Sequence, residues 1–381
     1  MEFRDLKKQY QKLKPQIDAA IHTVLDNANF ISGSQVAELE KRLAEYTGRK
    51  HCMTCGNGTD ALTLALMALK AGNGDAIFVP DFTFFATGET PAFAGATPVF
   101  VDIEQDTFNM SPSSLEDAIK AVKKAGKLVP KAIIAVDLFG QPADYDKIEA
   151  IAQKYGLFLI EDAAQGFGGN IRGKMACNFG DISCTSFFPA KPLGCYGDGG
   201  AVFTDNDDWA ALIRSYQIHG KGENKYDNVR VGINSRLDTM QAAILLAKLQ
   251  PFQEYELVSI NHIAKRYTEL LSDIVVTPSV KTGYTSSWAQ YSILLQNSKQ
   301  RDELQTYLKK NKVPSMIYYQ RPMHLQKAFK EMDCTYVDLS VTEQICQRVL
   351  ALPIHPYMEE SEIRTVVNLI LKEQEYSTHN A

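Results

Sequence analysis

The stretch that decides the fold of this chain is Ser186-Phe187-Phe188-Pro189-Ala190-Lys191-Pro192-Leu193-Gly194-Cys195-Tyr196-Gly197-Asp198-Gly199-Gly200-Ala201. It places Lys191 between two prolines that restrict the backbone, and a glycine-rich turn follows. Most lysines belong to a solvated surface, and that alternative stays open for a single lysine. Here apolar residues flank the lysine, so we expect its amine in a desolvated place where its pKa falls. An amine of that kind can form a Schiff base with an aldehyde.

The composition indicates an ordinary globular protein. Of the 381 residues, 45% are hydrophobic and 22% are charged, which allows a large core and gives no sign of disorder. The formal net charge is -5, and no basic run indicates binding to nucleic acid. The charged N-terminus lacks the apolar region of a signal peptide, and no stretch reads as a membrane span. We therefore expect a cytoplasmic protein whose partners are neither nucleic acids nor membranes.

The seven cysteines are spread through apolar segments, and their odd number favours reduced buried thiols over a disulfide framework. Cys52 and Cys55 have the spacing of a redox pair or of half a zinc site. Because no second pair of Cys or His stands at ligand spacing, we favour apolar filling of a strand and predict no metal.

Outward from Lys191 the chain alternates between short apolar strands and helices. Helices are expected over 59–70 and 145–155, and a third is expected to begin at a capping box of Ser113 and Glu116 and to end near Lys124. An amphipathic helix or arm is expected over 1–20. The expected strands are 51–55, 76–80, 97–103, 132–139, 157–161, 181–187 and 200–204. This alternation predicts an α/β fold, with a mostly parallel sheet that carries helices on both faces.

A change of pattern near residue 250 indicates a domain boundary. The chain is strongly helical from Leu237 to about Leu271, except that Pro251 is expected to break or kink the helix. We therefore expect a large domain with an N-terminal arm over 1–250 and a small α+β domain over 251–381.

Ligands of a parallel sheet bind beyond the carboxyl ends of its strands, so the residues that follow each strand are the candidates for a site. After the first strand, Gly58 and Thr59 open a helix and can cradle one phosphate, although a turn with a helix cap explains them equally well. After the second strand, Phe84 can stack on a planar ligand, although aromatic residues at such places are more often core.

Two further strand ends carry polar chemistry. Asp162 follows an apolar strand, where it is either a helix cap or a carboxylate that holds a proton on a heteroaromatic nitrogen. Ser186 adds a hydroxyl donor shortly before Lys191. A phosphate cradle, a stacking ring, a carboxylate and an imine-forming lysine are together the groups that bind pyridoxal 5'-phosphate. Their order along the chain makes pyridoxal 5'-phosphate the predicted cofactor.

These residues lie within longer stretches that resemble the nucleotide-sugar aminotransferases of the DegT and StrS type over nearly the whole chain. The resemblance implies the fold of aspartate aminotransferase, which is fold type I of the pyridoxal-phosphate enzymes, with 1–250 as the cofactor-binding domain. The stretches that carry it are Asn57–Leu62, Glu161–Gln165, Ser186–Lys191, Gly197–Gly200 and Gly232–Asp238.

The resemblance also implies a role for each candidate residue. Lys191 would attach the cofactor covalently and then transfer the proton, and Asp162 would pair with the pyridine nitrogen. Asn234 would reach the phosphate from a second subunit, which implies a homodimer with shared active sites. Arg236 would bind a substrate carboxylate, although a surface ion pair is an open alternative. The other implied cofactor contacts are Phe84 stacking on the ring, Gln165 at the ring face or its 3-hydroxyl, and Gly58, Thr59 and Ser186 at the phosphate.

Within this family the chain is similar to the enzymes that aminate UDP-2-acetamido-2-deoxy-3-oxo-glucuronate for bacterial surface polysaccharides such as O-antigen. The similar stretches are Pro189–Gly200, Val231–Asp238 and Leu352–Tyr357. The chain departs from that subgroup over Tyr318–His324, where the subgroup has His-Tyr-Pro before Pro-Leu. Tyr319 and His324 are the substrate contacts that we expect there, and this departure predicts that recognition of the sugar differs at this stretch.

We therefore expect an aminotransferase that moves an amino group from L-glutamate to a keto sugar nucleotide. Two alternatives stay open, namely a dTDP-keto-6-deoxysugar as the acceptor and a regulatory protein that binds a sugar nucleotide without turnover. Relatives that act as sugar dehydratases carry histidine in place of the lysine, so Lys191 argues against that activity.

Overall fold

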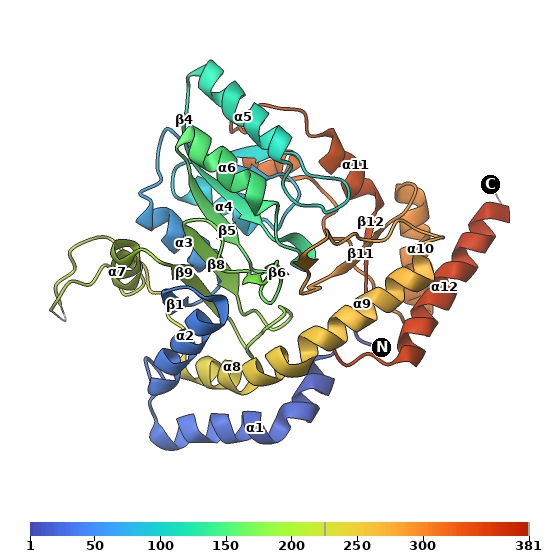
Figure 1. Cartoon of the computed structure of the whole chain (residues 1–381), viewed down its shortest axis with the longest axis horizontal. Helices are drawn as coiled ribbons and strands as arrows, with labels where there is room; N and C mark the ends of the chain where they lie inside the picture. Colours follow the sequence, from blue (N-terminus) through green and yellow to red (C-terminus); the bar gives the residue numbers. More distant parts are fainter. Residues whose placement is uncertain (225, 380–381) are drawn as a thin grey trace.

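The computed structural model describes residues 1–224 and 226–379, with side chains to residue 374. Its centre is a seven-stranded sheet with the order β1-β9-β8-β5-β4-β2-β3 (Figure 1). Neighbouring strands are parallel, except that β9 runs antiparallel to both β1 and β8. The predicted mostly parallel sheet is confirmed. Its strands are β1 (His51–Cys55), β2 (Asp75–Pro80), β3 (Thr97–Val101), β4 (Val129–Val136), β5 (Phe158–Asp162), β8 (Ile182–Ser186) and β9 (Gly200–Thr204).

Helices cover both faces of this sheet because successive side chains of each strand point to opposite sides. In β2, for example, Ile77 and Val79 belong to one buried cluster and Ala76 and Phe78 to another. The first face carries α3 (Gly58–Ala68), α4 (Ala86–Phe93) and α7 (Asp207–Tyr216). The second face carries α5 (Pro112–Ala125), α6 (Tyr145–Tyr155), α2 (Ser34–Thr47) and α8 (Thr239–Pro251).

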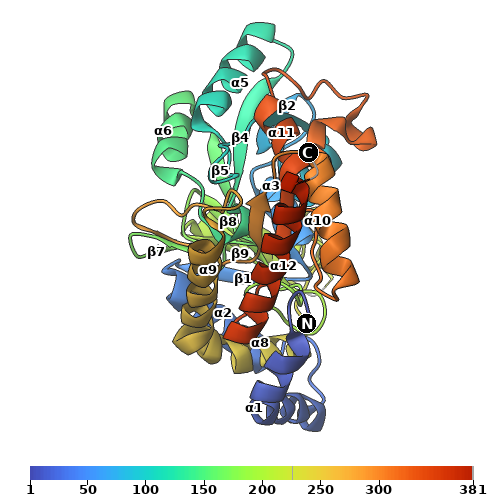
Figure 2. The ribbon, with the colours of Figure 1, turned by 90° about the vertical axis from the view of Figure 1, so that its right-hand side faces the viewer.

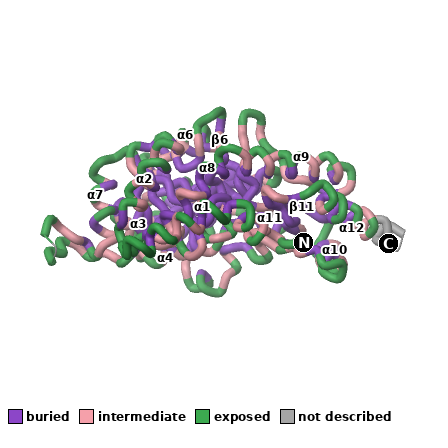
Figure 3. Tube along the Cα trace, turned by 90° about the horizontal axis from the view of Figure 1, so that it is seen from below, coloured by how far each residue is buried: buried purple, intermediate pink, exposed green. Residues whose placement is uncertain are grey.

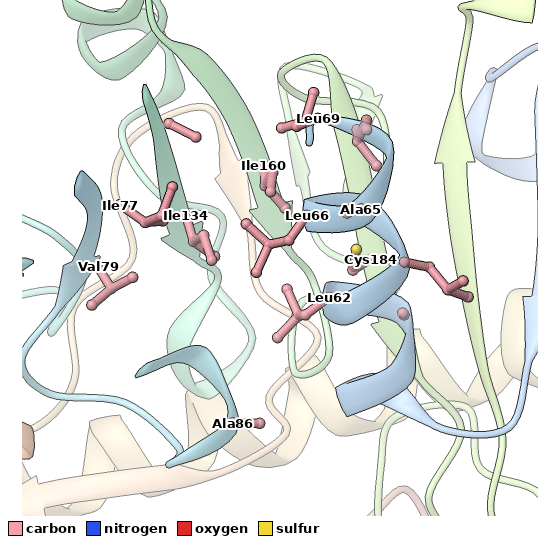
Figure 4. Close-up of a cluster of buried hydrophobic side chains, with 14 of the residues drawn as sticks. Leu62, Ala65, Leu66, Leu69, Ile77, Val79, Ala86, Ile134, Ile160 and Cys184 are labelled. Carbon is pink, nitrogen blue, oxygen red and sulfur yellow. The ribbon is translucent and has the colours of Figure 1, made fainter. Parts of the chain in front are cut away.

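Helix α3 is the helix that crosses the middle of the first face. Its residues Leu62 and Leu66 pack toward Ile134 of β4 and Ile160 of β5 (Figure 4). These four side chains are at most 2% exposed. At about 25 cal/mol per Å² of apolar area, burial of this kind fixes α3 firmly on the sheet. The N-terminus of α3 is thereby held at the carboxyl edge of the strands.

The N-terminal helix is longer than expected. Helix α1 (Leu6–Asn27) packs on α8, where Leu13 and Ile17 are buried against Ile244 (Figure 1). The segment that follows α7 extends away from the body of the protein and is largely exposed (Figure 3).

The regular α-helix is interrupted at Pro251, as expected. Helix α8 ends there, and a π-helical turn, Phe252–Glu256, leads directly into α9 (Leu257–Leu271), because a wider turn accommodates the missing amide of proline. One local prediction is wrong, since the predicted capping box is absent. Pro112 is the first residue of α5 and Ser111 is its N-cap, and the Oγ of Ser113 bonds to the Oγ of Ser111 at 3.0 Å.

The C-terminal part of the chain forms a second core. Strand β11 (Tyr291–Leu294) pairs antiparallel with β12 (Val349–Leu352), a strand that the sequence analysis missed. Around this pair lie α9, α10 (Ser298–Lys310), α11 (Ser340–Arg348) and α12 (Glu360–His379) (Figure 1). Met323 and Phe329 pack instead on the cluster beneath α4. A third, small sheet joins β10 (Tyr284–Thr285), β6 (Asn170–Ile171) and β7 (Lys174–Met175).

All seven cysteines are buried free thiols. Within residues 1–224 and 226–379, no helix is both long and apolar enough to cross a membrane. In the same part of the chain no three His, Cys, Asp or Glu side chains are grouped as ligands for a metal ion.

Candidate active site

The ends of β1 and β8 meet at the N-terminus of α3. The Oδ1 of Asn57 caps this helix by accepting a hydrogen bond from the amide of Asp60 at 2.8 Å. A Cβ on Gly58 would lie only 2.8 Å from the Cβ of Ser186, so glycine allows the helix to approach the end of β8. The first amides of a helix lack intrahelical acceptors and favour an anion. Gly58, Thr59 and Ser186 are therefore brought together as a cradle that fits a phosphate group.

Asp162 is the last residue of β5 and is 6% exposed. Its Oδ2 accepts a hydrogen bond from the hydroxyl of Thr87 at 3.0 Å, and its Oδ1 accepts from the amide of Ala164 at 3.2 Å. Burial raises the pKa of Asp162, while these two donors and the positive charge of Lys191 act against the rise. The carboxylate is thus held in one orientation and gains stability from a nearby cation.

Lys191 lies in the tight loop that follows β8, where its amide donates to the carbonyl of Phe188 at 2.8 Å. Burial lowers the pKa of Lys191 to about 8, although the charge of Asp162 favours the protonated amine. This lowered pKa fits the expected desolvation of the amine, although the residue as a whole is only half-buried. A substantial fraction of the amine is neutral at pH 7 to 8 and can act as a nucleophile or a base.

Gln165 is buried on the turn that follows Asp162. Its Oε1 accepts from the amide of Phe139 at 2.7 Å, and its Nε2 donates to the hydroxyl of Tyr319 at 3.1 Å. Gln165 and Tyr319 are therefore joined, which brings a predicted substrate contact beside a predicted cofactor contact.

Phe84 follows β2 and is 55% exposed, so its ring is not part of the core. This exposure fits a ring that stacks on a ligand or on another chain.

His324 is held by acidic groups. Its Nδ1 is 2.7 Å from the Oδ2 of Asp81, the first residue after β2, and its Nε2 lies 3.3 Å from Glu343. Partial burial acts to lower the pKa of His324, but the bonds to the two carboxylates outweigh it and raise the pKa. Both ring nitrogens of His324 therefore already face carboxylates.

Asn234 and Arg236 are exposed at the surface. Between them Ser235 is buried, donates to the Oδ2 of Asp60 at 2.6 Å and accepts from the amide of Gly56 at 2.9 Å. Ser235 thereby fixes this segment beside the phosphate cradle of its own chain. Asn234 and Arg236 are not brought to Lys191 of the same chain by any hydrogen bond that the described residues make.

Sequence reasoning assigned no role to three groups that shape the site, namely Thr87, Asp81 and Ser235. Thr87 lies in the first turn of α4, so it is not among the residues that directly follow β2. Its partner Asp162 is 75 residues away along the chain, so no local pattern pairs the two side chains.

The arrangement fits pyridoxal 5'-phosphate at each of its functional groups. A helix N-terminus that only glycine allows to approach Ser186 suits the phosphate, a buried carboxylate suits the ring nitrogen, and a desolvated amine suits the aldehyde. The residues present therefore fit this cofactor.

Comparisons with solved structures agree. A crystal structure of a DegT DnrJ EryC1 StrS aminotransferase from Brucella abortus is 49% identical with a TM-score of 0.95, covering 98% of this chain and 99% of that one. The structure of NtdA from Bacillus subtilis with bound cofactor PMP is 29% identical with a TM-score of 0.87, covering 96% and 82%. Fold and site define a pyridoxal-phosphate-dependent aminotransferase of fold type I.

The chain belongs to the DegT/DnrJ/EryC1/StrS aminotransferase family, whose model matches residues 11–371. It is 45% identical over 367 residues to the UDP-2-acetamido-2-deoxy-3-oxo-D-glucuronate aminotransferase of Pseudomonas aeruginosa. That match covers 96% of this chain and 98% of the relative.

Proposed function

We propose that this protein transfers the amino group of L-glutamate to a UDP-linked 3-oxo sugar, with the 2-acetamido uronate as the substrate. The observation that carries the proposal is the convergence of a desolvated lysine, a buried aspartate and a helix N-terminus at one edge of the sheet. The 45% identity to the Pseudomonas aeruginosa enzyme supports this choice of sugar.

Each candidate residue of this chain would have a separate role in the reaction. When bound, pyridoxal 5'-phosphate supplies an electron-withdrawing ring that stabilises negative charge at the substrate carbon. Asp162 would keep the ring nitrogen protonated, and Thr87 holds that carboxylate in place. Lys191 would hold the cofactor and carry the proton to and from the substrate carbon, which its lowered pKa allows at neutral pH. Gly58, Thr59 and Ser186 would anchor the phosphate.

A homodimer with shared active sites is part of the proposal. Asn234 and Arg236 are exposed beside the phosphate cradle, and the segment before them carries Val229 and Val231, which are 53% and 89% exposed. Exposed apolar side chains on an extended segment are typical of an interface with another chain. Asn234 would then reach the phosphate of the partner, and Arg236 would bind a substrate carboxylate there.

The test is the half-reaction in reverse. Purified protein loaded with pyridoxal 5'-phosphate is mixed with one amino compound at a time, and the absorbance of the cofactor reports its conversion to the amine form. L-Glutamate and the UDP-2-acetamido-3-amino uronate should both convert it. The matching 3-amino sugar without the carboxylate and a dTDP-3-amino-6-deoxysugar are the controls.

The outcomes distinguish the proposed substrate from a 6-deoxysugar and an enzyme from a regulatory binding protein. Faster conversion by the dTDP sugar would replace the proposed acceptor with a 6-deoxysugar. No conversion by any amine, with sugar nucleotide still bound, would favour the regulatory binder. The cytoplasmic location and the O-antigen pathway stay predictions, and cell fractionation tests the first of them.

A further inference from the structure

The N-terminal arm brings a cation to the loop of the proposed catalytic lysine. Nη2 of Arg4 donates to the carbonyl of Pro192, the residue after Lys191, at 3.4 Å. The arm is anchored on both sides of Arg4. The amide of Ile354 donates to the carbonyl of Phe3 at 3.2 Å, and Asp5 caps α1 by accepting from the amide of Lys8. The N-terminus lies beside α12 (Figure 2). Arg4 is therefore held in place rather than free in solvent.

The charge of Arg4 is poorly neutralised. Its Nη1 is buried and has no hydrogen-bond partner among the described residues. Glu256 is the acidic group that faces it, but the Oε1 of Glu256 already accepts from Nε2 of Gln9 at 2.9 Å and from the hydroxyl of Tyr357. Burial lowers the pKa of Arg4 to about 10, so the side chain stays a cation at neutral pH. Burying a cation without a full set of partners costs stability, and such groups are retained where function needs them.

We propose that Arg4 is a positioning residue for Lys191, which fixes the lysine loop through its hydrogen bond to Pro192 and places a cation beside the amine. The inference rests on the proposed function, because an amine that attacks an aldehyde must be neutral. Arg4 acts through the loop and through its charge, and it need not touch the substrate.

The other charged groups around the loop do not replace Arg4. Asp162 faces Lys191 from β5 and favours the protonated amine, whereas the charge of Arg4 lowers the pKa of Lys191. Lys248 of α8 donates to the carbonyl of Gly194, and burial lowers its pKa to about 8. Burial lowers the pKa of His355 to about 4, and the charge of Arg4 acts in the same direction, so His355 is neutral at pH 7. Removing the charge of Arg4 should therefore raise the pKa of Lys191.

The experiment measures the amine of Lys191 directly in the full chain stripped of cofactor. Acetic anhydride labels the lysines at a series of pH values, and peptide mass spectrometry gives the rate at Lys191. Arg4→Gln removes the charge but keeps a donor for Pro192, and Arg4→Lys keeps the charge. Lys7→Met changes an exposed cation of the same arm and is the control.

We expect Arg4→Gln to move the midpoint of labelling upward and to slow labelling at pH 7 about threefold to tenfold. Arg4→Lys and Lys7→Met should stay near the wild type. An unchanged midpoint in Arg4→Gln, or an equal change in Arg4→Gln and Arg4→Lys, would overturn the proposal. If Arg4→Gln does not fold, Arg4→Met replaces it under the same criteria. Failure of the wild type to attach pyridoxal 5'-phosphate would contradict the proposed function instead, since labelling needs no cofactor.

Discussion

The carboxylate of Asp162 depends on a neighbour from another element. Thr87 on α4 donates to its Oδ2, and this hydroxyl lowers the pKa that burial raises. We predict that Thr87→Val, which keeps the shape and removes the donor, lowers kcat/KM about tenfold, because one hydrogen bond to a charged group contributes about 1.5 kcal/mol. The acid limb of the pH profile should move to higher pH.

Thr90→Val is the matched control for this prediction. Thr90 is buried on the same helix, and its hydroxyl donates to the carbonyl of Ala86 at 2.9 Å, away from Asp162. The measurement is kcat/KM as a function of pH for both variants. Equal losses in the two variants would show that packing of α4, and not the hydrogen bond, explains the effect.

The burial of His355 allows a prediction of how the free energy of unfolding depends on pH. It is 2% exposed, and burial lowers its pKa from 6.5 to about 4. The unfolded chain therefore binds a proton at this histidine below pH 6.5, where the folded chain does not. Stability falls as the pH drops from about 6.5 to about 4, by at most about 3 kcal/mol from this group.

The measurement is the urea midpoint at pH 7, 6, 5 and 4. His355→Gln should show a smaller loss over that range than the wild type, whereas His262→Gln, at an exposed position, should match the wild type. If the urea midpoint falls equally with pH in all three proteins, the claim that His355 is buried and neutral is contradicted.

The sequence best predicts the function of single residues when an uncommon local pattern surrounds a chemically reactive side chain. Lys191 between two prolines and Asp162 at a strand end are where the structure places a desolvated amine and a buried carboxylate. The roles proposed for them stay predictions. Arg4 and Thr87 could not be found in this way, because their importance comes from distant segments that only the folded chain brings together.

At the scale of elements, helix α3 joins the core to the site. Its apolar face is fixed on the sheet, so its N-terminus cannot move freely away from Ser186 (Figure 4). We predict that Gly58→Ala weakens the binding of pyridoxal 5'-phosphate about tenfold or more, because the added Cβ would lie 2.8 Å from the Cβ of Ser186. Absorbance titration of the stripped protein measures this.

Gly72→Ala is the control, because a Cβ there would approach only the carbonyl of Ala94, at 3.9 Å. Its affinity for the cofactor should equal that of the wild type. If Gly58→Ala binds the cofactor as tightly as the wild type, the close approach of α3 to Ser186 is not needed for phosphate binding.

Strands and helices of the large sheet follow from local pattern, as β1, β9 and α6 show by matching their expected bounds. Strand β12 does not, because its four residues follow α11 without a turn signal and are defined by pairing with β11, more than 50 residues away. The continuity from α8 to α9 also depends on tertiary packing, since buried Phe252 and Glu256 lie in the π-helical turn.

At the scale of the whole molecule, the exposed segment after α7 carries the homodimer proposal (Figure 3). We predict that Val231→Asp shifts the protein from dimer to monomer and lowers activity, because a charge would be buried where an apolar contact is proposed. Size-exclusion chromatography with light scattering gives the mass.

Val258→Asp, at a position on α9 that is 69% exposed, is the control. A wild-type protein that is monomeric at all concentrations would contradict the shared site.

The division of the chain at residues 250 and 251 stays a prediction. The second core extends from Ile260 to Ile370, but Met323 and Phe329 pack on the first core. Limited proteolysis, with the fragments identified by mass, would show whether cleavage falls near Pro251.

The central claim is that the amine of Lys191 holds the cofactor. Borohydride reduction of protein supplied with pyridoxal 5'-phosphate, followed by peptide mapping, tests it most directly. The account predicts one labelled peptide, which contains Lys191, and no label in Lys191→Ala. A label on another lysine, or none in the wild type, would contradict it.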